Sequence, residues 1–224
     1  MNLTLFDLDG TLIETDSDHA FGEFLVRHAW VDSVEFKRRN DAFYADYLAG
    51  CLDLPAYVAF ATGGWRHRPL KEALALRERF MAEMMRPALK PAAQALVKRH
   101  QDAGDLVAIV TATNEFVTEP IAREFGVEHL IALRLERDAQ GQATGAILGT
   151  PTFREGKIRR VDEWLRALGH ADGRNAFDTI TVYSDSINDL PLLEWATHPV
   201  ATNPAASLAE VAQQRGWPIL RLFT

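Results

Sequence analysis

The stretch LFDLDGTL, residues 5–12, places two carboxylates one residue apart directly after an apolar run near the N-terminus. Residues Leu3 to Phe6 have the short, apolar character of a buried strand, and the run ends at Asp7. Buried carboxylates are costly unless opposite charges or hydrogen bonds compensate them. The stretch therefore predicts a strand whose end holds acids together with compensating groups from elsewhere in the chain.

The composition is that of a soluble globular protein. The chain has 224 residues, of which 47% are hydrophobic and 25% charged, which is enough to bury a full core. A net charge of -7 argues against nucleic acid or an anionic membrane as a partner. Cys51 is the only cysteine, so neither an internal disulfide nor a cysteine-based zinc site can form.

Neither a signal-peptide pattern nor an apolar run of membrane-spanning length is present in the sequence. We therefore expect a cytoplasmic protein with no membrane partner. For the oligomeric state, both a monomer and a homodimer stay open.

Hydrophobic periodicity divides the chain into a helical part and an alternating part. From about residue 17 to 86 the spacing is helical and no strand is evident. Strands and helices then alternate. The predicted elements are a helix at 91–102, a strand at 106–110, a helix at 115–125, a strand, turn and return strand within 129–148, a helix at 156–168, a strand at 179–183, a helix at 189–195, a strand at 199–202 and a helix from about 205.

This alternation predicts an α/β fold, a doubly wound, mainly parallel sheet of Rossmann type covered by helices on both faces. The helical part then forms an inserted cap. We expect residues 1–15 and 88–224 to form the catalytic core and residues 16–87 to form the cap. In such sheets, sites lie at the carboxyl ends of the strands.

Acidic and polar side chains gather where the predicted strands end. Two acids follow the first strand, a threonine follows the strand at 106–110, and further acids follow the strand at 179–183. A lysine at the start of the preceding helix adds a cation. We expect these groups to lie together at one edge of the sheet; they are Asp7, Asp9, Thr111, Lys157, Asp185, Asn188 and Asp189.

This set predicts a magnesium site that receives a phosphate ester. Several acids beside one buried lysine would repel one another unless a divalent metal lay among them. Mg²⁺ prefers oxygen ligands and completes its shell with water and substrate phosphate. The Thr111 hydroxyl and the following amides, that of Ala112 included, would seat the phosphate at a helix N-terminus, and Lys157 would neutralise a transferring phosphoryl group.

The sequences DLDGT and SDSINDL, with Thr111 and Lys157 between them, resemble the four motifs of the haloacid dehalogenase superfamily, in particular the branch with phosphoserine phosphatase. The motifs span residues 7–189 in the family's order. In that family the fourth motif usually begins Gly-Asp, whereas this chain has Ser184-Asp185. The resemblance implies the same fold, an inserted helical cap and magnesium-dependent hydrolysis of phosphate esters.

The resemblance also implies roles for single residues. Asp7 corresponds to the nucleophile that forms an aspartyl-phosphate, and we also expect it to be a metal ligand. Asp9 corresponds to the general acid and base, and its backbone carbonyl to a metal ligand. Asp185 corresponds to a side-chain metal ligand. The remaining expectations are phosphate binding by Thr111, Ala112, Lys157 and Asn188, and a supporting role behind the metal for Asp189.

Several of these residues also have plainer interpretations. The first acids could open a calcium loop, although their spacing is not that of an EF-hand. Thr111 taken alone reads as a helix N-cap, and Lys157 as a solvated first-turn lysine. Asp189 could be an ordinary acid at a helix N-terminus.

Substrate selection is expected to involve the cap. Asp16 falls where phosphoserine phosphatases carry the acid that binds the substrate ammonium, although it also reads as an N-cap. An acid there suits an amino-alcohol phosphate. Arg66 and Arg68 are candidates to bind the carboxylate of phosphoserine, whereas histidinol phosphate has no carboxylate. The chain also resembles bacterial relatives assigned to histidinol-phosphate hydrolysis.

Two other functions stay open. A phosphotransferase or phosphomutase would use the same aspartyl-phosphate with a hydroxyl in place of water. A regulatory domain could keep the fold and bind phosphate without turnover.

Overall fold

A six-stranded parallel sheet lies at the centre of the computed structural model, which describes residues 1–223. Its strand order is β3-β2-β1-β6-β7-β8. The strands are β1 (Asn2–Phe6), β2 (Leu106–Asn114), β3 (His129–Leu133), β6 (Thr179–Ser184), β7 (His198–Thr202) and β8 (Ile219–Leu220). The predicted α/β, doubly wound parallel sheet is confirmed.

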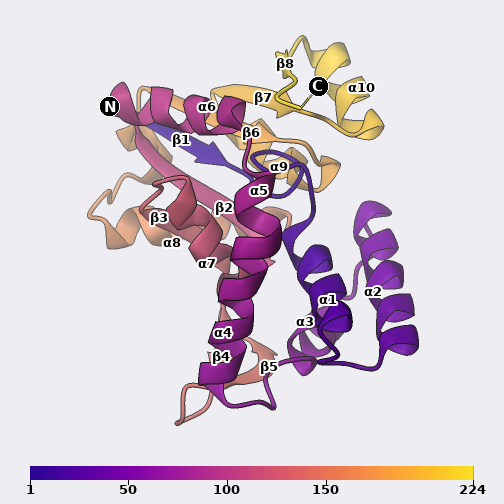
Figure 1. Ribbon diagram of the computed structural model, residues 1–224. Helices are drawn as coiled ribbons and strands as arrows, with labels where there is room; N and C mark the ends of the chain where they lie inside the picture. The colour runs from indigo at the N-terminus through magenta and orange to yellow at the C-terminus, as the bar shows by residue number, and fades with distance from the viewer. Residues whose placement is uncertain (224) are drawn as a thin grey trace.

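The order of the strands reverses at β1, and this reversal positions the site. From β1 the chain proceeds to β2 and β3 on one side, then returns to β6 on the other (Figure 1). In register, Phe6 lies between Ile109 of β2 and Tyr183 of β6. One residue on, the backbone N–H of Asp7 donates to the Tyr183 carbonyl at 2.9 Å. Crevices at such reversals are where α/β sheets bind ligands.

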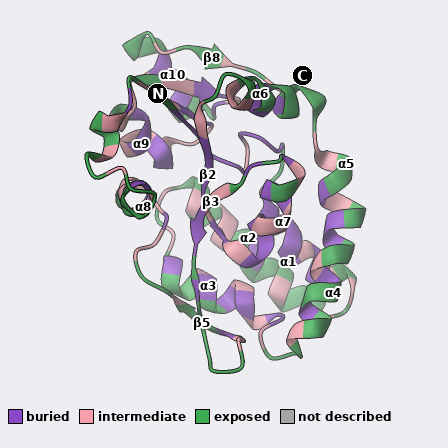
Figure 2. Ribbon diagram, turned by 90° about the vertical axis from the view of Figure 1, so that its left-hand side faces the viewer, coloured by how far each residue is buried: buried purple, intermediate pink, exposed green. Residues whose placement is uncertain are grey.

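Helices cover both faces of the sheet, as the period of two along β1 requires. Leu3 and Leu5 point into one apolar cluster and Phe6 into the other. The first cluster contains side chains of α8 (Glu155–Ala167), α9 (Leu190–Trp195) and α10 (Ala206–Arg215), and the second those of α6 (Pro91–Asp102) and α7 (Glu115–Glu124). Figure 2 shows the buried strands β2 and β3 between these helices.

The segment between β1 and α6 is helical, as predicted, and most of it lies below the sheet in Figure 1. Aspartates start three of its helices, because the side chains of Asp16, Asp32 and Asp53 accept hydrogen bonds from backbone N–H groups of the first turn. The elements are α1 (Ser17–Arg27), α2 (Ser33–Leu48), α3 (Leu54–Gly63), α4 (Leu70–Phe80), a π-helical turn (Met81–Met85) and α5 (Arg86–Ala88).

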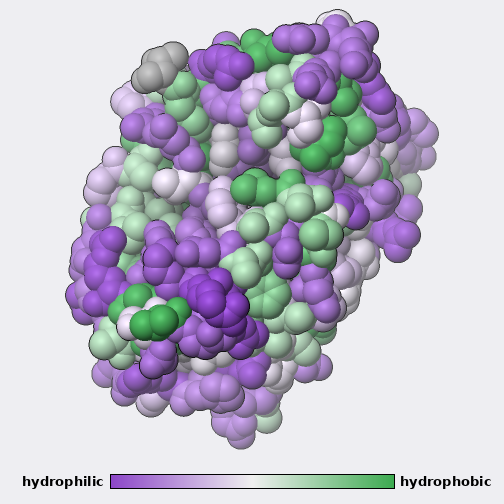
Figure 3. All heavy atoms as spheres, turned by 90° about the vertical axis from the view of Figure 1, so that its right-hand side faces the viewer, coloured by the Kyte–Doolittle hydropathy of each residue, from purple (hydrophilic) through white to green (hydrophobic). Residues whose placement is uncertain are grey.

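Helix α2 contributes little to the core. Among its described residues only Asn40 is buried, whereas Val34 and Leu48 are 80% and 60% exposed. Figure 3 shows the face on the α2 side of the molecule, where hydrophilic side chains cover much of the area and apolar ones lie between them in small groups. Residues 1–223 include no helix whose length and hydropathy would let it cross a lipid bilayer.

The structure differs from the predicted strand pair within 129–148. β3 joins the main sheet, while β4 (Leu135–Arg137) and β5 (Ala143–Ile147) form a separate antiparallel hairpin that packs on α3. The burial pattern gives the reason. β3 is buried or half-buried throughout, as a parallel strand should be, whereas β5 alternates buried and exposed residues like a strand with one wet face.

Smaller differences concern the ends of elements. β2 continues beyond the predicted strand to Asn114, and β8 at the edge of the sheet was not predicted. The helix predicted at 189–195 begins earlier, with a 3-10 turn at Ile187–Asp189, and a second 3-10 turn lies at Gly173–Ala176.

Candidate active site

A buried lysine joins two of the predicted acids. Lys157, the third residue of α8, is 1% exposed. Its Nζ lies 2.8 Å from Asp7 Oδ1 and 2.7 Å from Asp189 Oδ2. Burial favours the neutral amine, but the carboxylates of Asp189 and Asp7 outweigh burial and raise the pKa of Lys157. The structure thus places a charged lysine in contact with Asp7. The interpretation of Lys157 as a solvated lysine is wrong.

The serine that departs from the family pattern has a definite contact. Ser184, fully buried at the end of β6, donates through Oγ to Asp189 Oδ2 at 2.8 Å and accepts from the Ser186 N–H at 3.2 Å. Asp189 Oδ2 therefore receives both the Lys157 ammonium and this hydroxyl. Serine supplies a hydrogen bond that glycine at this position would lack.

Thr11 brings two of the three predicted metal ligands, Asp7 and Asp185, together. Its Oγ1 lies 3.1 Å from Asp185 Oδ1 and 3.4 Å from Asp7 Oδ2, and it accepts from the Asp185 N–H at 3.0 Å. Gly10 makes the approach possible, since a Cβ there would lie 2.2 Å from Asp185 Oδ2. Thr11 is part of the opening stretch, but its spacing alone did not reveal a partner 174 residues away.

The donor set fits a divalent cation. Asp7, Asp185 and Asp189 face a single lysine, so negative charge is in excess. Burial raises the pKa of Asp185 well above its usual value, and the neighbouring carboxylates of Asp7 and Asp189 raise it further. For Asp7, burial raises the pKa and Lys157 opposes it. Hard oxygen donors with uncompensated charge suit Mg²⁺.

Asp9 is held by two donors from different elements. Its Oδ1 accepts from the Ser17 N–H at 2.7 Å, at the start of α1, and its Oδ2 accepts from Thr113 Oγ1 at 2.8 Å, near the end of β2. Burial, followed by the negative charge of Asp16, raises the pKa of Asp9 to about 7. A carboxyl group with such a pKa can both give and take a proton near neutral pH. Sequence reasoning did not identify Thr113, because nothing in the sequence pairs it with Asp9.

Thr111 and Ala112 lie within β2 and not at a helix N-terminus. Asn114 is the N-cap of α7, its side chain accepting from the Val117 N–H at 3.3 Å. The N-cap interpretation of Thr111 is therefore wrong. Its Oγ1 accepts from the Thr113 N–H at 3.1 Å, and both Thr111 and Ala112 line the pocket described below.

Asn188 contacts the inserted helices. Its Nδ2 donates to the Tyr47 carbonyl at 3.1 Å, near the end of α2. Arg154 makes a parallel contact, donating through Nη2 to the Gly50 carbonyl two residues beyond that helix. The side chain of Asn188 is thus engaged by backbone, and its binding of phosphate stays a prediction.

A pocket lies between the sheet edge and the inserted helices. It encloses about 40 Å³, room for only a few water molecules. The strand ends form one end of the pocket, and α1, α2 and α3 form the other. The lining residues are Asp7, Asp9, Asp16, Asp18, His19, Asn40, Phe43, Tyr44, Tyr47, Leu52, Leu54, Tyr57, Thr111, Ala112, Thr113 and Phe153.

Asp16 lies in this pocket, and the two predicted arginines do not. Asp16 both lines the pocket and caps α1, accepting from the His19 N–H at 2.8 Å, so its two interpretations are compatible. Arg66 instead contacts Thr62 and His67, and Arg68 stacks on Trp30 at 4.7 Å. The β4–β5 hairpin holds both arginines away from the pocket.

Gln142 of this hairpin donates to the backbone carbonyls of Arg66 and Arg68, holding their loop at the outer end of the inserted helices. Sequence alone could not foresee that anchor.

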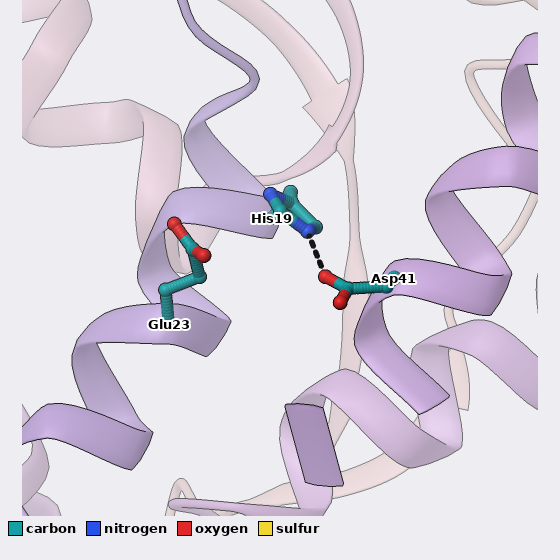
Figure 4. Close-up of side chains that lie close together, drawn as sticks. All are labelled: His19, Glu23 and Asp41. Carbon is teal, nitrogen blue, oxygen red and sulfur yellow. Dashed lines mark hydrogen bonds and ion pairs between the residues drawn. The ribbon is translucent and has the colours of Figure 1, made fainter. Parts of the chain in front are cut away.

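A second cluster of potential ligands lies on α1 and α2 (Figure 4). His19, Glu23 and Asp41 place one ligand atom each within 4.8 Å of one another. The His19 Nε2 lies 2.9 Å from Asp41 Oδ1. Lys37 already supplies a positive charge there, since its Nζ lies 3.0 Å from Asp41 Oδ2 and 3.5 Å from Glu23 Oε1. This cluster is therefore an ion-pair network between two helices.

Two proteins with similar sequences are named as phosphatases. A protein of Neisseria meningitidis serogroup C (strain 8013) named histidinol-phosphatase is 41% identical over 98% of both chains. A protein of Mycobacterium tuberculosis (strain ATCC 25618 / H37Rv) named as a phosphoserine phosphatase is 31% identical, over 96% of this chain and 68% of that one.

Solved structures agree with the fold. A protein of unknown function from Bordetella pertussis Tohama I superposes with a TM-score of 0.92 at 47% identity, covering 99% of both chains. A substrate-bound phosphoserine phosphatase superposes with a TM-score of 0.68 at 16% identity, covering 97% of this chain and 91% of that one, and shows the same fold. The model of the haloacid dehalogenase-like hydrolases matches residues 4–194. The chain therefore belongs to the haloacid dehalogenase-like hydrolase family, in its phosphatase branch.

Proposed function

We propose that this phosphomonoesterase is magnesium-dependent and hydrolyses a small amino-alcohol phosphate through an aspartyl-phosphate on Asp7. One observation carries the proposal: Lys157 bridges Asp7 and Asp189 beside Asp185, at the sheet edge that borders the pocket. A buried carboxylate held by a lysine and next to a second acid is poised for phosphoryl transfer. The relatives named above, with amino-alcohol phosphates in their names, support the class of substrate.

The residues divide the reaction between them. Asp7 attacks phosphorus through a carboxylate oxygen, while Lys157, the Thr111 hydroxyl and the Ala112 N–H stabilise the phosphoryl oxygens. Asp7, Asp185 and the backbone carbonyl of Asp9 would hold Mg²⁺, which supplies charge neutralisation when bound.

Asp9 serves the proton transfers. In the first step it protonates the leaving alkoxide, and in the second it takes a proton from the water that attacks the aspartyl-phosphate. Thr113 and the Ser17 N–H fix both carboxylate oxygens of Asp9. Since Ser17 starts α1, the position of the inserted helices and the orientation of the acid are linked.

We propose that residues 16–87 form a cap. The helices of this segment narrow the pocket to a volume that excludes most water. Admission of an ester then requires these helices to move.

The first test compares Asp7→Asn with the wild type on p-nitrophenyl phosphate and Mg²⁺. We expect the variant to lose at least about 1,000-fold in kcat, because an amide is not a nucleophile. Asp102→Asn, an exposed acid on α6, is the matched control and should keep wild-type activity. Activity of Asp7→Asn near that of the control would remove Asp7 as the nucleophile.

The same assay tests metal and reaction type. EDTA should abolish turnover and excess Mg²⁺ should restore it, and hydrolysis that resists EDTA would contradict the metal proposal. Equal amounts of p-nitrophenol and inorganic phosphate identify a phosphatase. A deficit of inorganic phosphate in the presence of added alcohols would instead identify a phosphotransferase.

A further inference from the structure

The pocket carries more acids than cations. Four aspartates line it, and within residues 1–223 its lining includes no lysine or arginine side chain. Asp7 and Asp9 belong to the chemical steps. Asp16 and Asp18 lie at the start of α1, beyond the reacting atoms. One buried and one half-buried carboxylate at the end of the pocket away from the strand ends favour a ligand that brings positive charge.

Asp18 is the more buried of this pair. It is 7% exposed, and its Oδ1 accepts from Asn114 Nδ2 at 3.2 Å, across from α1 to the N-cap of α7. Tyr57 of α3 lies beside Asp18, and its hydroxyl helps to lower the pKa of that carboxyl group. Neutral donors hold the carboxylate in place and leave its charge uncompensated. Burial raises the pKa of Asp18 to about 6, and the hydrogen bonds and His19 oppose this rise only in part.

Aromatic rings form the walls around this acid. Phe43, Tyr44, Tyr47 and Tyr57 line the pocket from α2 and α3, and Phe153 lines it from the core. Aromatic walls suit a flat ring, and their faces attract cations. His19 also lines the pocket, but its ring stacks on Tyr44 at 4.8 Å and its Nε2 lies 2.9 Å from Asp41 Oδ1, so Asp41 and not Asp18 is the acid that its ring contacts.

We propose that Asp18, with Tyr57 and the aromatic wall, binds a nitrogen heterocycle of the substrate, so that the preferred substrate is the phosphate ester of an amino alcohol that carries a basic aromatic ring and no carboxylate. The proposal rests on the proposed function above and names its substrate class. Asp16 remains for the substrate's ammonium group. An ester that carries a carboxylate would place a further negative charge among buried acids and is disfavoured.

The test compares four esters on the wild type. They are histidinol phosphate, with an ammonium and an imidazole; phosphoethanolamine, with an ammonium alone; phosphoserine, with an ammonium and a carboxylate; and p-nitrophenyl phosphate, with neither. We expect kcat/KM for histidinol phosphate to exceed that for phosphoserine by at least about 100-fold. If phosphoserine is the better substrate, the proposal is overturned.

Asp18→Asn then isolates the ring-binding group. The amide keeps the shape and still accepts from Asn114, but it lacks the charge. We expect kcat/KM for histidinol phosphate to fall about 30- to 100-fold, mainly through KM, while phosphoethanolamine and p-nitrophenyl phosphate change less than about threefold. Glu23→Gln removes a charge of α1 that pairs with Lys37 and does not line the pocket, and it is the control, expected to leave all four values unchanged.

Two further outcomes test whether Asp18 binds the ring. An equal loss on all four esters in Asp18→Asn would show a purely structural role and overturn the proposal. Should that variant not fold by circular dichroism, Tyr57→Phe keeps the ring and removes the hydroxyl donor, and a selective loss of about 3- to 10-fold on histidinol phosphate is expected. The proposed phosphatase function fails separately, if p-nitrophenyl phosphate is not hydrolysed by the wild type.

Discussion

Gly10 shows how a single missing side chain positions the metal ligands. Its φ is +73°, a left-handed conformation that is costly for residues with a Cβ. A Cβ at this position would also lie 2.2 Å from Asp185 Oδ2. Gly126, after α7, has a similar φ of +65°, but open space surrounds the position of its Cβ. A comparison of alanine substitutions at the two glycines therefore distinguishes the effect of backbone strain from the effect of displacing Asp185.

We predict that Gly10→Ala lowers kcat/KM for p-nitrophenyl phosphate about 10- to 100-fold and raises the Mg²⁺ concentration for half-maximal activity, because Asp185 must move. Gly126→Ala carries the same strain, about 1–2 kcal/mol, and should keep wild-type kinetics. Steady-state assays over a magnesium titration measure both. Equal kinetics in the two variants would show that the approach of Gly10 to Asp185 has no consequence for the site.

Sequence reasoning found the charged residues of the site and missed their neutral partners. Asp7, Lys157 and Asp185 follow predicted strands or start a helix, and strand ends converge in a parallel sheet. Thr113 and the contact of Ser184 with Asp189 depend on side-chain rotamers and on strand length, which no spacing encodes. The same limit applies to Arg66, whose surroundings are set by a hairpin 70 to 80 residues further along the chain.

Helix α2 is attached to the core by few contacts. Asn188 donates to the Tyr47 carbonyl and Arg154 to the Gly50 carbonyl, so two core side chains hold the end of a helix that buries one residue. Arg154 itself has a φ of +51°, unusual for a residue with a side chain. The strained backbone and the contact with the segment after α2 occur at the same residue, which favours a role in holding the inserted helices against the sheet.

We predict that Arg154→Ala increases the rate of proteolytic cleavage in the loop at 49–53 about tenfold, since a hydrogen bond from a charged donor contributes about 1.5 kcal/mol to local closure. Arg154→Gly should be cleaved as fast as Arg154→Ala. Its free energy of unfolding in urea should be higher than that of Arg154→Ala by about 1 kcal/mol, because glycine relieves the φ strain. Arg166→Ala, which changes an exposed arginine on α8, the helix that follows Arg154, is the control. Unchanged cleavage in both Arg154 variants would contradict the proposed attachment.

The elements themselves were predictable where one physical rule decides them. Amphipathic spacing identified the helices at 17–86, and apolar runs identified β1, β2 and β6. β8 escaped because two residues at a sheet edge carry no pattern, and the hairpin at 135–147 was merged with β3 because apolar periodicity does not show which sheet a strand joins.

At the scale of the molecule, the halves of the sheet are tied together behind the site. His100, at the end of α6, places Nδ1 2.7 Å from Asp105 Oδ2 and Nε2 2.8 Å from the Tyr183 hydroxyl of β6. Thr4 of β1 donates to Asp105 Oδ2 at 2.9 Å. One buried carboxylate thus links a helix, the turn before β2 and the central strand, and we expect it to influence global stability.

This network gives the stability a defined dependence on pH. Burial would raise the pKa of Asp105, but hydrogen bonds from His100, Thr4 and Asn2 outweigh burial and lower it below the usual value. A carboxyl group whose pKa is lower in the folded state stabilises that state above its unfolded pKa of about 3.9. The contribution disappears as the pH falls through the folded-state pKa, when the carboxylate is protonated in both states.

We therefore predict that Asp105→Asn lowers the free energy of unfolding by about 1–3 kcal/mol at pH 7, because the variant loses charged hydrogen bonds. The difference from the wild type should persist at pH 5 and shrink below pH 4, since only the wild type loses this contribution in acid. Urea unfolding at pH 7, 5 and 3 measures the difference. Asp102→Asn, which removes an exposed acid paired with Lys98 on α6, should change the value by less than about 0.5 kcal/mol at every pH. A difference for Asp105→Asn that stays constant down to pH 3 would show that the shape of the side chain, and not its charge, holds the two halves of the sheet together.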